Sequence, residues 1–319
     1  MPAIEARALE RTFEGGIQAV AGVDLEVSDG EIYAFLGPNG AGKTTTVRML
    51  TTLLRPTGGS ARVAGFEVVE DPASVRRAIG VALQEAALDP LMTGRELIRL
   101  QATLHGLSKR DGNQRAEALL ERVDLVDVAD RQVGTYSGGM RRRLDLASAL
   151  VHEPRVLFLD EPTTGLDPVS RRTIWEEVEA LNREGTTVFL TTQYLEEADQ
   201  LADRVGIIDF GRIVAEDTPT LLKAQIGQPH LEIRLIDGSA EQAEEIVSRF
   251  GKPLPRKDGA VLVELEGGAT RVAPVVRALD EAGLGVEALD LVEPTLDDVF
   301  LAKTGHHLEP EERETGEDE

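Results

Sequence analysis

The fold is decided by the stretch Gly37-Pro38-Asn39-Gly40-Ala41-Gly42-Lys43-Thr44-Thr45. It matches the pattern G-x-x-x-x-G-K-[ST], follows an apolar run at residues 32–36 and precedes a helical pattern from Lys43 to about Leu54. Glycines let the backbone curl so that its N–H groups point at phosphate oxygens, and the helix N-terminus adds its positive dipole end. We expect Lys43 to contact the β- and γ-phosphates of a nucleotide and the Thr44 hydroxyl to bind Mg²⁺. The alternative is a glycine-rich turn that binds nothing, and the complete pattern between strand and helix disfavours it.

Two carboxylates follow a second apolar run. Asp160 and Glu161 come directly after residues 155–159, which predict a buried strand. Open α/β sheets bind ligands beyond the carboxyl ends of their strands, so Asp160 suits Mg²⁺ and Glu161 suits an attacking water that must be oriented and deprotonated. Acids are also common as helix N-caps, and that is the alternative for this pair taken alone. The phosphate-binding pattern upstream favours the catalytic interpretation.

Short apolar runs alternate with helical patterns in the first part of the chain. Residues 187–191 and 204–209 predict two more buried strands. Continuous apolar strands separated by helices indicate a parallel sheet that is covered on both faces. Between about residues 88 and 152 the pattern becomes helical, with helices predicted at residues 93–105, 110–123 and 138–151. This region is therefore expected to be a helical insertion in an α/β domain.

The pattern changes after Leu222. Strands are predicted at residues 231–236 and 260–265 and helices at 240–250 and 270–282, which gives a small α/β domain over residues 229–303. Leu296, Val299 and Phe300 have i, i+3, i+4 spacing, so they share one helical face that must bury against its own domain, a partner copy or a membrane protein. Asp297 and Asp298 are expected to cap or charge the start of that helix. Residues 305–319 are predicted to be an acidic, disordered tail.

The composition excludes several classes of function. The chain has 319 residues, 41% of them hydrophobic, which suits one large domain and a smaller one. Its net charge of −23 argues against binding nucleic acid or an anionic membrane by bulk electrostatics. The absence of cysteine excludes disulfides, thiolate metal sites and cysteine nucleophiles. No signal-peptide pattern or membrane-spanning apolar run is present, so we expect a soluble, cytoplasmic protein.

A third motif, Tyr136-Ser137-Gly138-Gly139-Met140-Arg141, opens a predicted helix. By itself it is weak evidence, because a Ser-Gly-Gly turn can be an ordinary N-cap. Together, however, the motifs resemble the nucleotide-binding subunit of ATP-binding cassette (ABC) transporters over residues 3–222. Residues 37–45 correspond to the Walker A motif and residues 156–161 to Walker B. Residues 137–141 resemble the signature motif, whose usual form has Gln where this chain has Met140.

The resemblance implies a fold and a set of site residues. The fold is a P-loop NTPase cassette over residues 3–226, with a mostly parallel sheet core, an antiparallel N-terminal β part and the helical insertion. Gln84 occupies the position of the Q-loop glutamine, residues 165–168 match the D-loop, and Phe13 lies where an aromatic ring stacks on adenine. The cofactors are ATP and Mg²⁺, with Thr44, Gln84 and Asp160 assigned to the metal. Nucleotide binding is assigned to Phe13, Gly37, Pro38, Asn39, Gly40, Ala41, Gly42, Lys43, Thr44, Thr45, Gln84, Ser137, Gly138 and Gly139.

One position departs from the family pattern. The family carries a switch histidine in the loop at residues 191–199, but the residue here is Gln193, and no histidine lies in that loop. An amide can donate a hydrogen bond to the γ-phosphate but cannot accept and return a proton as imidazole can. We therefore expect catalysis to depend on Glu161 as the base, with Gln193 contacting the phosphate.

The end of the chain narrows the resemblance. Residues 293–301, Glu-Pro-Thr-Leu-Asp-Asp-Val-Phe-Leu, resemble the end of daunorubicin-resistance-type exporter ATPases, which also tend to carry Gln in the switch loop. That subgroup pairs with a separately encoded permease and exports drugs, antibiotics or lipids. The resemblance implies a head-to-tail homodimer on ATP binding, with each ATP between residues 37–45 of one copy and Ser137–Gly139 of the other. It also implies a peripheral location on the inner face of the membrane, through the permease.

Two other classes of function remain as alternatives. One is a soluble ABC-type ATPase that acts on ribosomes or DNA, which the single cassette and the lack of a basic stripe disfavour. The other is an unrelated phosphate-loop kinase or GTPase, which the Ser137–Gly139 turn disfavours. The sequence does not name the cargo or the permease. It also leaves open whether the dimer persists without ATP, and whether the C-terminal domain regulates the protein or only stabilises it.

Overall fold

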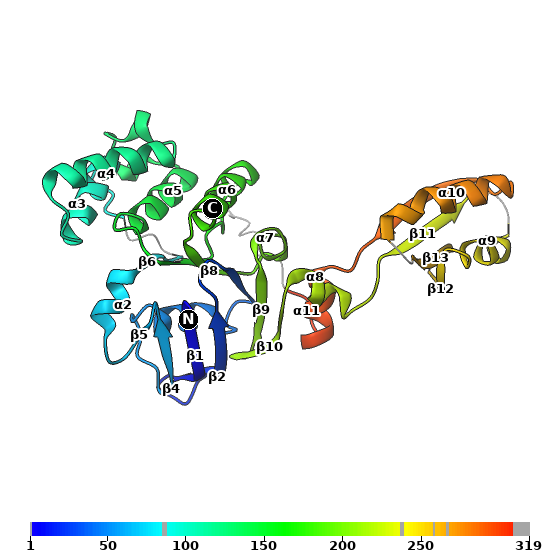
Figure 1. Cartoon of the computed structure of the whole chain (residues 1–319), viewed down its shortest axis with the longest axis horizontal. Coiled ribbons are helices and arrows are strands. Elements are labelled where there is room, and N and C mark those ends of the chain that lie inside the picture. The colour runs from blue at the N-terminus through cyan, green and yellow to red at the C-terminus, as the bar shows by residue number, and fades with distance from the viewer. Residues whose placement is uncertain (1, 85–87, 237–238, 258, 266–267, 309–319) are drawn as a thin grey trace, which may run out of the picture. The chain divides into compact units, whose positions relative to one another are not determined.

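The computed structural model describes residues 2–84, 88–236, 239–257, 259–265 and 268–308. The predicted tail beyond residue 308 lies outside the described residues. The chain divides into two compact units, the first ending at Pro219 and the second spanning Thr220–His306. The described part of the first unit holds two sheets and that of the second holds one, and Figure 1 labels their elements.

The first unit is built on a sheet with the strand order β10-β9-β3-β8-β7-β6. Neighbouring strands from β9 to β6 are parallel, and β10 runs antiparallel to β9. All residues of β3, β7 and β8 are buried, which confirms the mostly parallel core predicted from their continuous apolar runs. The strands are β3 (Ile32–Leu36), β6 (Ile79–Ala82), β7 (Val156–Asp160), β8 (Thr187–Thr192), β9 (Arg204–Asp209) and β10 (Arg212–Asp217).

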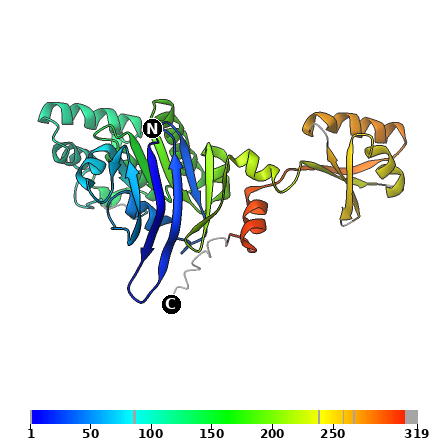
Figure 2. The ribbon, with the colours of Figure 1, turned by 60° about the horizontal axis from the view of Figure 1, so that its bottom comes forward.

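A second sheet supplies the antiparallel N-terminal part. Its order is β2-β1-β4-β5, and its strands are β1 (Ile4–Thr12), β2 (Gln18–Val27), β4 (Gly58–Val63) and β5 (Phe66–Glu67). Apolar residues of β1, β2 and β4 share one buried cluster with Tyr33 and Phe35 of β3 and Met49 of the first helix. Figure 2 shows the long β1–β2 hairpin in blue. The predicted antiparallel part is therefore confirmed.

Helices complete this unit. They are α1 (Lys43–Leu50), α2 (Pro72–Ala78), α3 (Gly94–Leu104), α4 (Lys109–Arg122), α5 (Gly138–Ala149), α6 (Pro168–Arg183) and α7 (Leu195–Leu201), with 3₁₀ turns at Val126–Val128 and Val133–Thr135. Helices α3, α4 and α5 contact one another and form the predicted helical insertion (Figure 1). The α1 helix ends before the predicted Leu54, because Thr52 has a left-handed backbone with φ of 66° that a helix cannot continue.

The second unit holds an antiparallel sheet with the order β12-β13-β11-β14. Its elements are α8 (Pro219–Ala224), β11 (His230–Leu235), α9 (Ala240–Val247), β12 (Gly251–Lys257), β13 (Ala260–Leu265), a 3₁₀ turn at Gly268–Arg271, α10 (Val272–Glu281), β14 (Val286–Val292) and α11 (Leu296–Thr304). From β11 to β14 the chain follows the β-α-β-β-α-β order of a ferredoxin-like domain. Figure 2 shows α10 along one face of this sheet.

The sequence analysis missed β12 and β14, and both are edge strands. Pro253 and Pro255 interrupt the strand pattern of β12, and proline is tolerated on an edge because the missing N–H leaves no central ladder bond unmade. The sequence of β14 places acidic residues within a short apolar run, and the strand is only half-buried. A search for alternating apolar and polar residues does not detect β12 or β14, because both strands depend on their position at the edge of the sheet.

The α11 helix carries the apolar stripe predicted from the sequence. Leu296, Val299 and Phe300 are 2%, 0% and 0% exposed, so the predicted stripe is the buried face of this helix. Thr295 and Asp298 form a capping box at its start, which makes Asp298 the capping residue of the predicted acidic pair. None of the helices in the described ranges has the length and apolar character needed to cross a bilayer.

Candidate functional site

The loop between β3 and α1 takes the shape expected of a phosphate cradle. Gly42 precedes α1 with φ of 107°, a conformation that favours glycine, and an added Cβ there would lie 2.4 Å from the Ala19 carbonyl oxygen. An added Cβ at Gly37 would lie 2.3 Å from the carbonyl oxygen of Ile208. The two glycines therefore allow close backbone packing that no other residue permits. The first N–H groups of α1 are left for an anionic ligand.

Lys43 lies inside this loop and is 4% exposed. Its ammonium donates hydrogen bonds to the carbonyl oxygens of Gly37 (2.7 Å) and Pro38 (3.1 Å). It also forms an ion pair with Glu161 Oε1 at 3.2 Å. Burial lowers the pKa of Lys43, and the charges of Glu161 and Asp160 oppose that effect. The structure thus brings the two sequence motifs into direct contact.

Asp160 lies at the end of β7 and is fully buried. Its Oδ1 accepts hydrogen bonds from the hydroxyls of Thr44 (3.2 Å) and Thr191 (2.5 Å). Its Oδ2 is buried and has no hydrogen-bond partner among the described residues. An orphaned carboxylate oxygen beside a threonine hydroxyl fits Mg²⁺, which prefers hard oxygen ligands and keeps several waters. Thr44 and Asp160 are therefore able to hold the cation implied by the sequence.

Glu161 follows Asp160 and has a left-handed backbone with φ of 48°, which is uncommon for a non-glycine residue. Its N–H donates to both Oγ1 and the carbonyl oxygen of Thr191, each at 3.1 Å, and these bonds hold the unusual conformation. Its Oε2 accepts a hydrogen bond from the Gln84 amide at 3.1 Å. Gln84 thus contacts the carboxylate assigned as base, and its assignment to the metal stays a prediction.

Two residues that the sequence analysis did not single out organise this site. Thr191, at the carboxyl end of β8, bonds to both carboxylate residues, and its place at that edge is a signal that could have found it. Arg142 gives no such signal, because a buried arginine on a helix is not apparent from the sequence. It is 9% exposed, and its guanidinium donates to the carbonyl oxygens of Asp160 (2.9 Å), Pro162 (2.8 Å) and Leu83.

Arg142 therefore joins α5 to β7 and to the residue before Gln84. Its charge is paired with Asp145 at 3.3 Å. Burial raises the pKa of Asp145 to about 6, and the charge of Arg142 opposes that rise. A guanidinium can bind several carbonyls in one plane at once, so one side chain fixes segments that are distant in the sequence.

The remaining predicted residues are not joined to this cluster by the contacts above. Ser137 is the N-cap of α5 and accepts a hydrogen bond from Met140 N–H at 3.2 Å, as in the simpler interpretation of that motif. Phe13 lies after β1 and is 38% exposed, and the Arg11 guanidinium lies 4.7 Å from the centroid of its ring. Gln193 is half-buried between β8 and α7. Asp167 is the N-cap of α6 and accepts from the N–H groups of Val169 and Ser170.

Comparison with known proteins identifies related chains. A model of the ABC transporter family matches residues 20–164. A model of the C-terminal domain of DrrA1-3-like ATP-binding proteins matches residues 218–304. Daunorubicin resistance ATP-binding protein DrrA2 of Streptomyces coeruleorubidus is 48% identical over 315 residues, 96% of each chain. Daunorubicin/doxorubicin resistance ATP-binding protein DrrA of Streptomyces peucetius is 46% identical and covers 99% of this chain and 97% of its own length.

Solved structures give the same result for the first unit. A dimeric ATP-binding cassette in a post-hydrolysis state, bound to ADP and Pi, is 26% identical with a TM-score of 0.63. It covers 67% of this chain and 98% of its own. The ATP-binding subunit of an ABC transporter is 27% identical with a TM-score of 0.64, over 70% of this chain and 92% of its own.

The position of Arg142 generates a prediction. Arg142→Lys places one ammonium where a planar guanidinium reaches three carbonyls, so Asp160 and Glu161 lose their support. We expect ATP hydrolysis to fall by about tenfold or more while ATP affinity changes by less than about threefold. The matched control is Arg143→Lys. Arg143 donates to the carbonyl oxygen of Val123 (2.7 Å) and not to the carbonyls that Arg142 binds. Steady-state hydrolysis and equilibrium ATP binding measure the effect, and equal losses in both variants would contradict it.

Proposed function

The chain belongs to the ABC transporter ATPase family, and we propose that it hydrolyses ATP to drive export of a drug, antibiotic or lipid through a separate membrane permease. The observation that carries the catalytic part is the cluster of Lys43, Thr44, Asp160 and Glu161, joined by contacts of 3.2 Å at the end of the central sheet. Support for the cargo class comes from the relatives that confer resistance to daunorubicin and doxorubicin. An ATPase that acts on ribosomes or DNA is not favoured, because the two relatives described above, which match nearly the whole chain, are named as drug-resistance ATP-binding proteins.

The geometry suggests how each residue would act on ATP. Lys43 would leave the carbonyls of Gly37 and Pro38 for the phosphates, which carry more negative charge. Its ion pair with Glu161 would then weaken, and the Glu161 carboxylate would be available to orient a water and accept its proton. Thr44 and Asp160 would hold Mg²⁺, which neutralises charge on the β- and γ-phosphates. Nucleotide binding would thus release the base that hydrolysis needs.

The role of Glu161 gives the first functional prediction. Glu161→Gln keeps a hydrogen-bonding side chain but removes the base, so ATP binding is retained and turnover falls by about 10²-fold or more. An ATP-trapped dimer should also become visible by light scattering. The matched control is Glu121→Gln, which changes an exposed glutamate of α4 and should leave turnover unchanged. Near-normal turnover in Glu161→Gln would contradict the assigned role.

Gln193 would contact the γ-phosphate without relaying a proton. It follows the last residue of β8, so the carboxyl-end edge that carries Thr191 also carries this amide. An amide donor supplies a hydrogen bond to a phosphate oxygen, and imidazole supplies the same bond.

We therefore expect Gln193→His to be tolerated, and Gln193→Ala to lower turnover by about tenfold because a buried phosphate contact is lost. Gln200→Ala, on the exposed side of α7, is the control. Hydrolysis in the assembled transporter is the measurement. Wild-type turnover of the alanine variant would show that the switch assignment is wrong.

A head-to-tail homodimer is proposed for the ATP-bound state. Ser137–Gly139 would contact the ATP held by residues 37–45 of the other copy, through the N-terminus of α5. The dimeric form of the related cassette bound to ADP and Pi supports this arrangement. Closure of the dimer would exclude water other than the attacking one, and hydrolysis would reopen it.

A groove in the first unit suits the permease. It has a volume of about 410 Å³. Its lining includes Leu97 and Gln101 of α3, Ala149 of α5, Ile79 of β6 and Leu83, which directly follows β6. Leu83 precedes Gln84, and its carbonyl oxygen accepts a hydrogen bond from Arg142, so a helix docked here would lie close to groups that hold Glu161. We propose that the permease binds this groove and places the protein on the inner face of the membrane.

The second unit is proposed to serve assembly or regulation. Every residue assigned to phosphate or metal lies before residue 206. We accordingly divide the chain into a cassette at residues 3–226 and an accessory domain at 229–303. The match to a DrrA-type C-terminal domain supports the same division.

A chain that ends after Gly227 should still bind ATP but dimerise and export less well. Phe300→Ala in the full chain should act in the same direction, because removal of a buried phenyl ring costs roughly 3 kcal/mol or more. Nucleotide affinity, dimer fraction and drug accumulation in cells measure the three properties. Unimpaired export by the truncated chain would contradict the proposal, as would loss of ATP binding in a truncated chain that is still folded.

A further inference from the structure

Glu197 is a buried acid to which neither the sequence motifs nor the proposed chemistry assigns a role. It lies in the first turn of α7 and is 0% exposed. Its Oε1 accepts a hydrogen bond from the Thr163 hydroxyl and another from the Trp175 indole N–H, each at 2.9 Å. One carboxylate oxygen thus holds two donors from two other segments of the chain.

Thr163, one of the two donors, belongs to the segment that carries Glu161, and Glu197 itself follows the loop that carries Gln193. Thr163 lies two residues after Glu161, and its carbonyl oxygen accepts from Leu166 N–H (3.2 Å) in the loop before α6. Trp175 lies in the middle of α6, and Glu197 lies four residues after Gln193. The carboxylate therefore connects the segment of Glu161, the α6 helix and the helix that follows the switch loop.

An acid at this position is costly for the fold. Burial raises the pKa of Glu197, and hydrogen bonds from Thr192, Trp175 and Thr163 lower it. An apolar side chain of similar size would avoid the desolvation cost of a carboxyl group. The benefit of the acid must come from the bonds it makes, since it accepts at once from the buried Thr163 hydroxyl and from the half-buried Trp175 indole.

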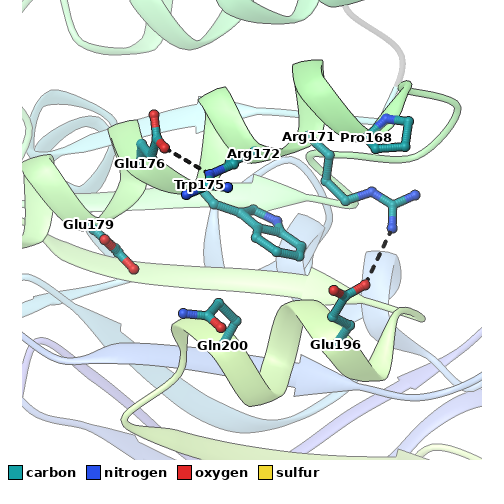
Figure 3. Close-up of a pocket in the computed structure, with 8 residues that line it drawn as sticks. All are labelled: Pro168, Arg171, Arg172, Trp175, Glu176, Glu179, Glu196 and Gln200. Carbon is teal, nitrogen blue, oxygen red and sulfur yellow. Dashed lines mark hydrogen bonds and ion pairs between the residues drawn. The ribbon is translucent and has the colours of Figure 1, made fainter.

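Figure 3 shows the outer side of the same arrangement. Trp175 projects from α6 toward α7 and lines a cavity of about 580 Å³ together with Arg172, Glu196 and Gln200. Its indole N–H is bonded to Glu197, so the ring links the cavity wall to the buried carboxylate. Trp175 is the single tryptophan of the chain, so tryptophan fluorescence reports on the surroundings of this one indole, which include its bond to Glu197.

We propose that Glu197 is a positioning residue that makes Glu161 and the Gln193 loop change position together when ATP binds. By holding Thr163 and Trp175, it transmits a movement of the residues after Glu161 to α6 and α7. This inference rests on the proposed roles of Glu161 and Gln193 in hydrolysis. The carboxylate itself does not touch the nucleotide, so its loss affects the rate and not the binding of ATP.

The test compares Glu197→Leu, which removes the acceptor, with Glu197→Gln, which keeps an acceptor oxygen. We expect the leucine variant to lower the single-turnover hydrolysis rate by about tenfold or more, with ATP affinity within about threefold of the wild type. The glutamine variant should restore the rate to within about threefold. Glu196→Leu is the matched control, since Glu196 is exposed and its pair with Arg171, at 4.0 Å, is weak.

The energetic coupling between Thr163 and Glu197 is measured by combining variants of the two residues. Thr163→Val removes the donor hydroxyl, and adding it to Glu197→Leu should lower the rate little further, because the leucine variant has already lost the Thr163–Glu197 bond. If Glu197→Leu does not fold, Thr163→Val is compared with Thr163→Ser instead. Only the serine variant keeps the hydroxyl that donates to Glu197, so only this variant should keep the wild-type rate. ATP should change Trp175 emission in the wild type and not in Glu197→Leu, which lacks the hydrogen bond between Trp175 and Glu197.

Three results would overturn the proposal. They are additive effects of the Thr163 and Glu197 variants, a glutamine variant as slow as the leucine variant, and a Trp175 emission that does not respond to ATP. Normal turnover in Glu161→Gln would overturn the base assignment instead. In that case the ATP-dependent emission of Trp175 still tests whether the Glu161 segment and the Gln193 loop move together. Failure of the base assignment and failure of the Glu197 proposal are therefore distinguishable.

Discussion

Leu36 of β3 pairs with Thr192 of β8, and Asp160 of β7 pairs with Thr191 of the same strand, so three segments reach one edge of the sheet in register. The phosphate loop, the two carboxylates and the switch loop each begin where one of these strands ends. Because these strands are parallel, their carboxyl ends lie at the same edge of the sheet. The contact between Lys43 and Glu161 exists because of this arrangement, although the two residues are far apart in the sequence.

The site concentrates charge in a buried region, and its hydrogen bonds explain how the fold tolerates that. Lys43 and Glu161 neutralise each other, and Arg142 is paired with Asp145. A buried ion pair gains little net stability, because desolvation of the two charges offsets their attraction. Such pairs are consistent with a functional role, since a ligand of higher charge can replace one partner. A triphosphate is a ligand of this kind.

The two units of the chain differ in where they place polar and apolar side chains. The first places polar side chains at the ends of buried strands, where a ligand can approach. The second encloses a core of aliphatic side chains, including Leu231, Ile233, Val263 and Leu279, between an antiparallel sheet and two helices. All residues that we assign to phosphate or metal lie in the first unit. Function is therefore assigned by residues and not by the fold of each unit.

The sequence by itself determined the phosphate loop, the carboxylate pair, the buried strands and the α11 stripe, because each is a local pattern of residue types. Spacing and composition do not show which distant side chains meet. Arg142, Thr191 and Glu197 were identified only from the tertiary structure, since their partners lie on other segments. The edge strands β12 and β14 were missed for a related reason, because an edge position is a property of the assembled sheet. Local patterns specify which chemistry is present, and the packing of distant segments decides which side chains support it.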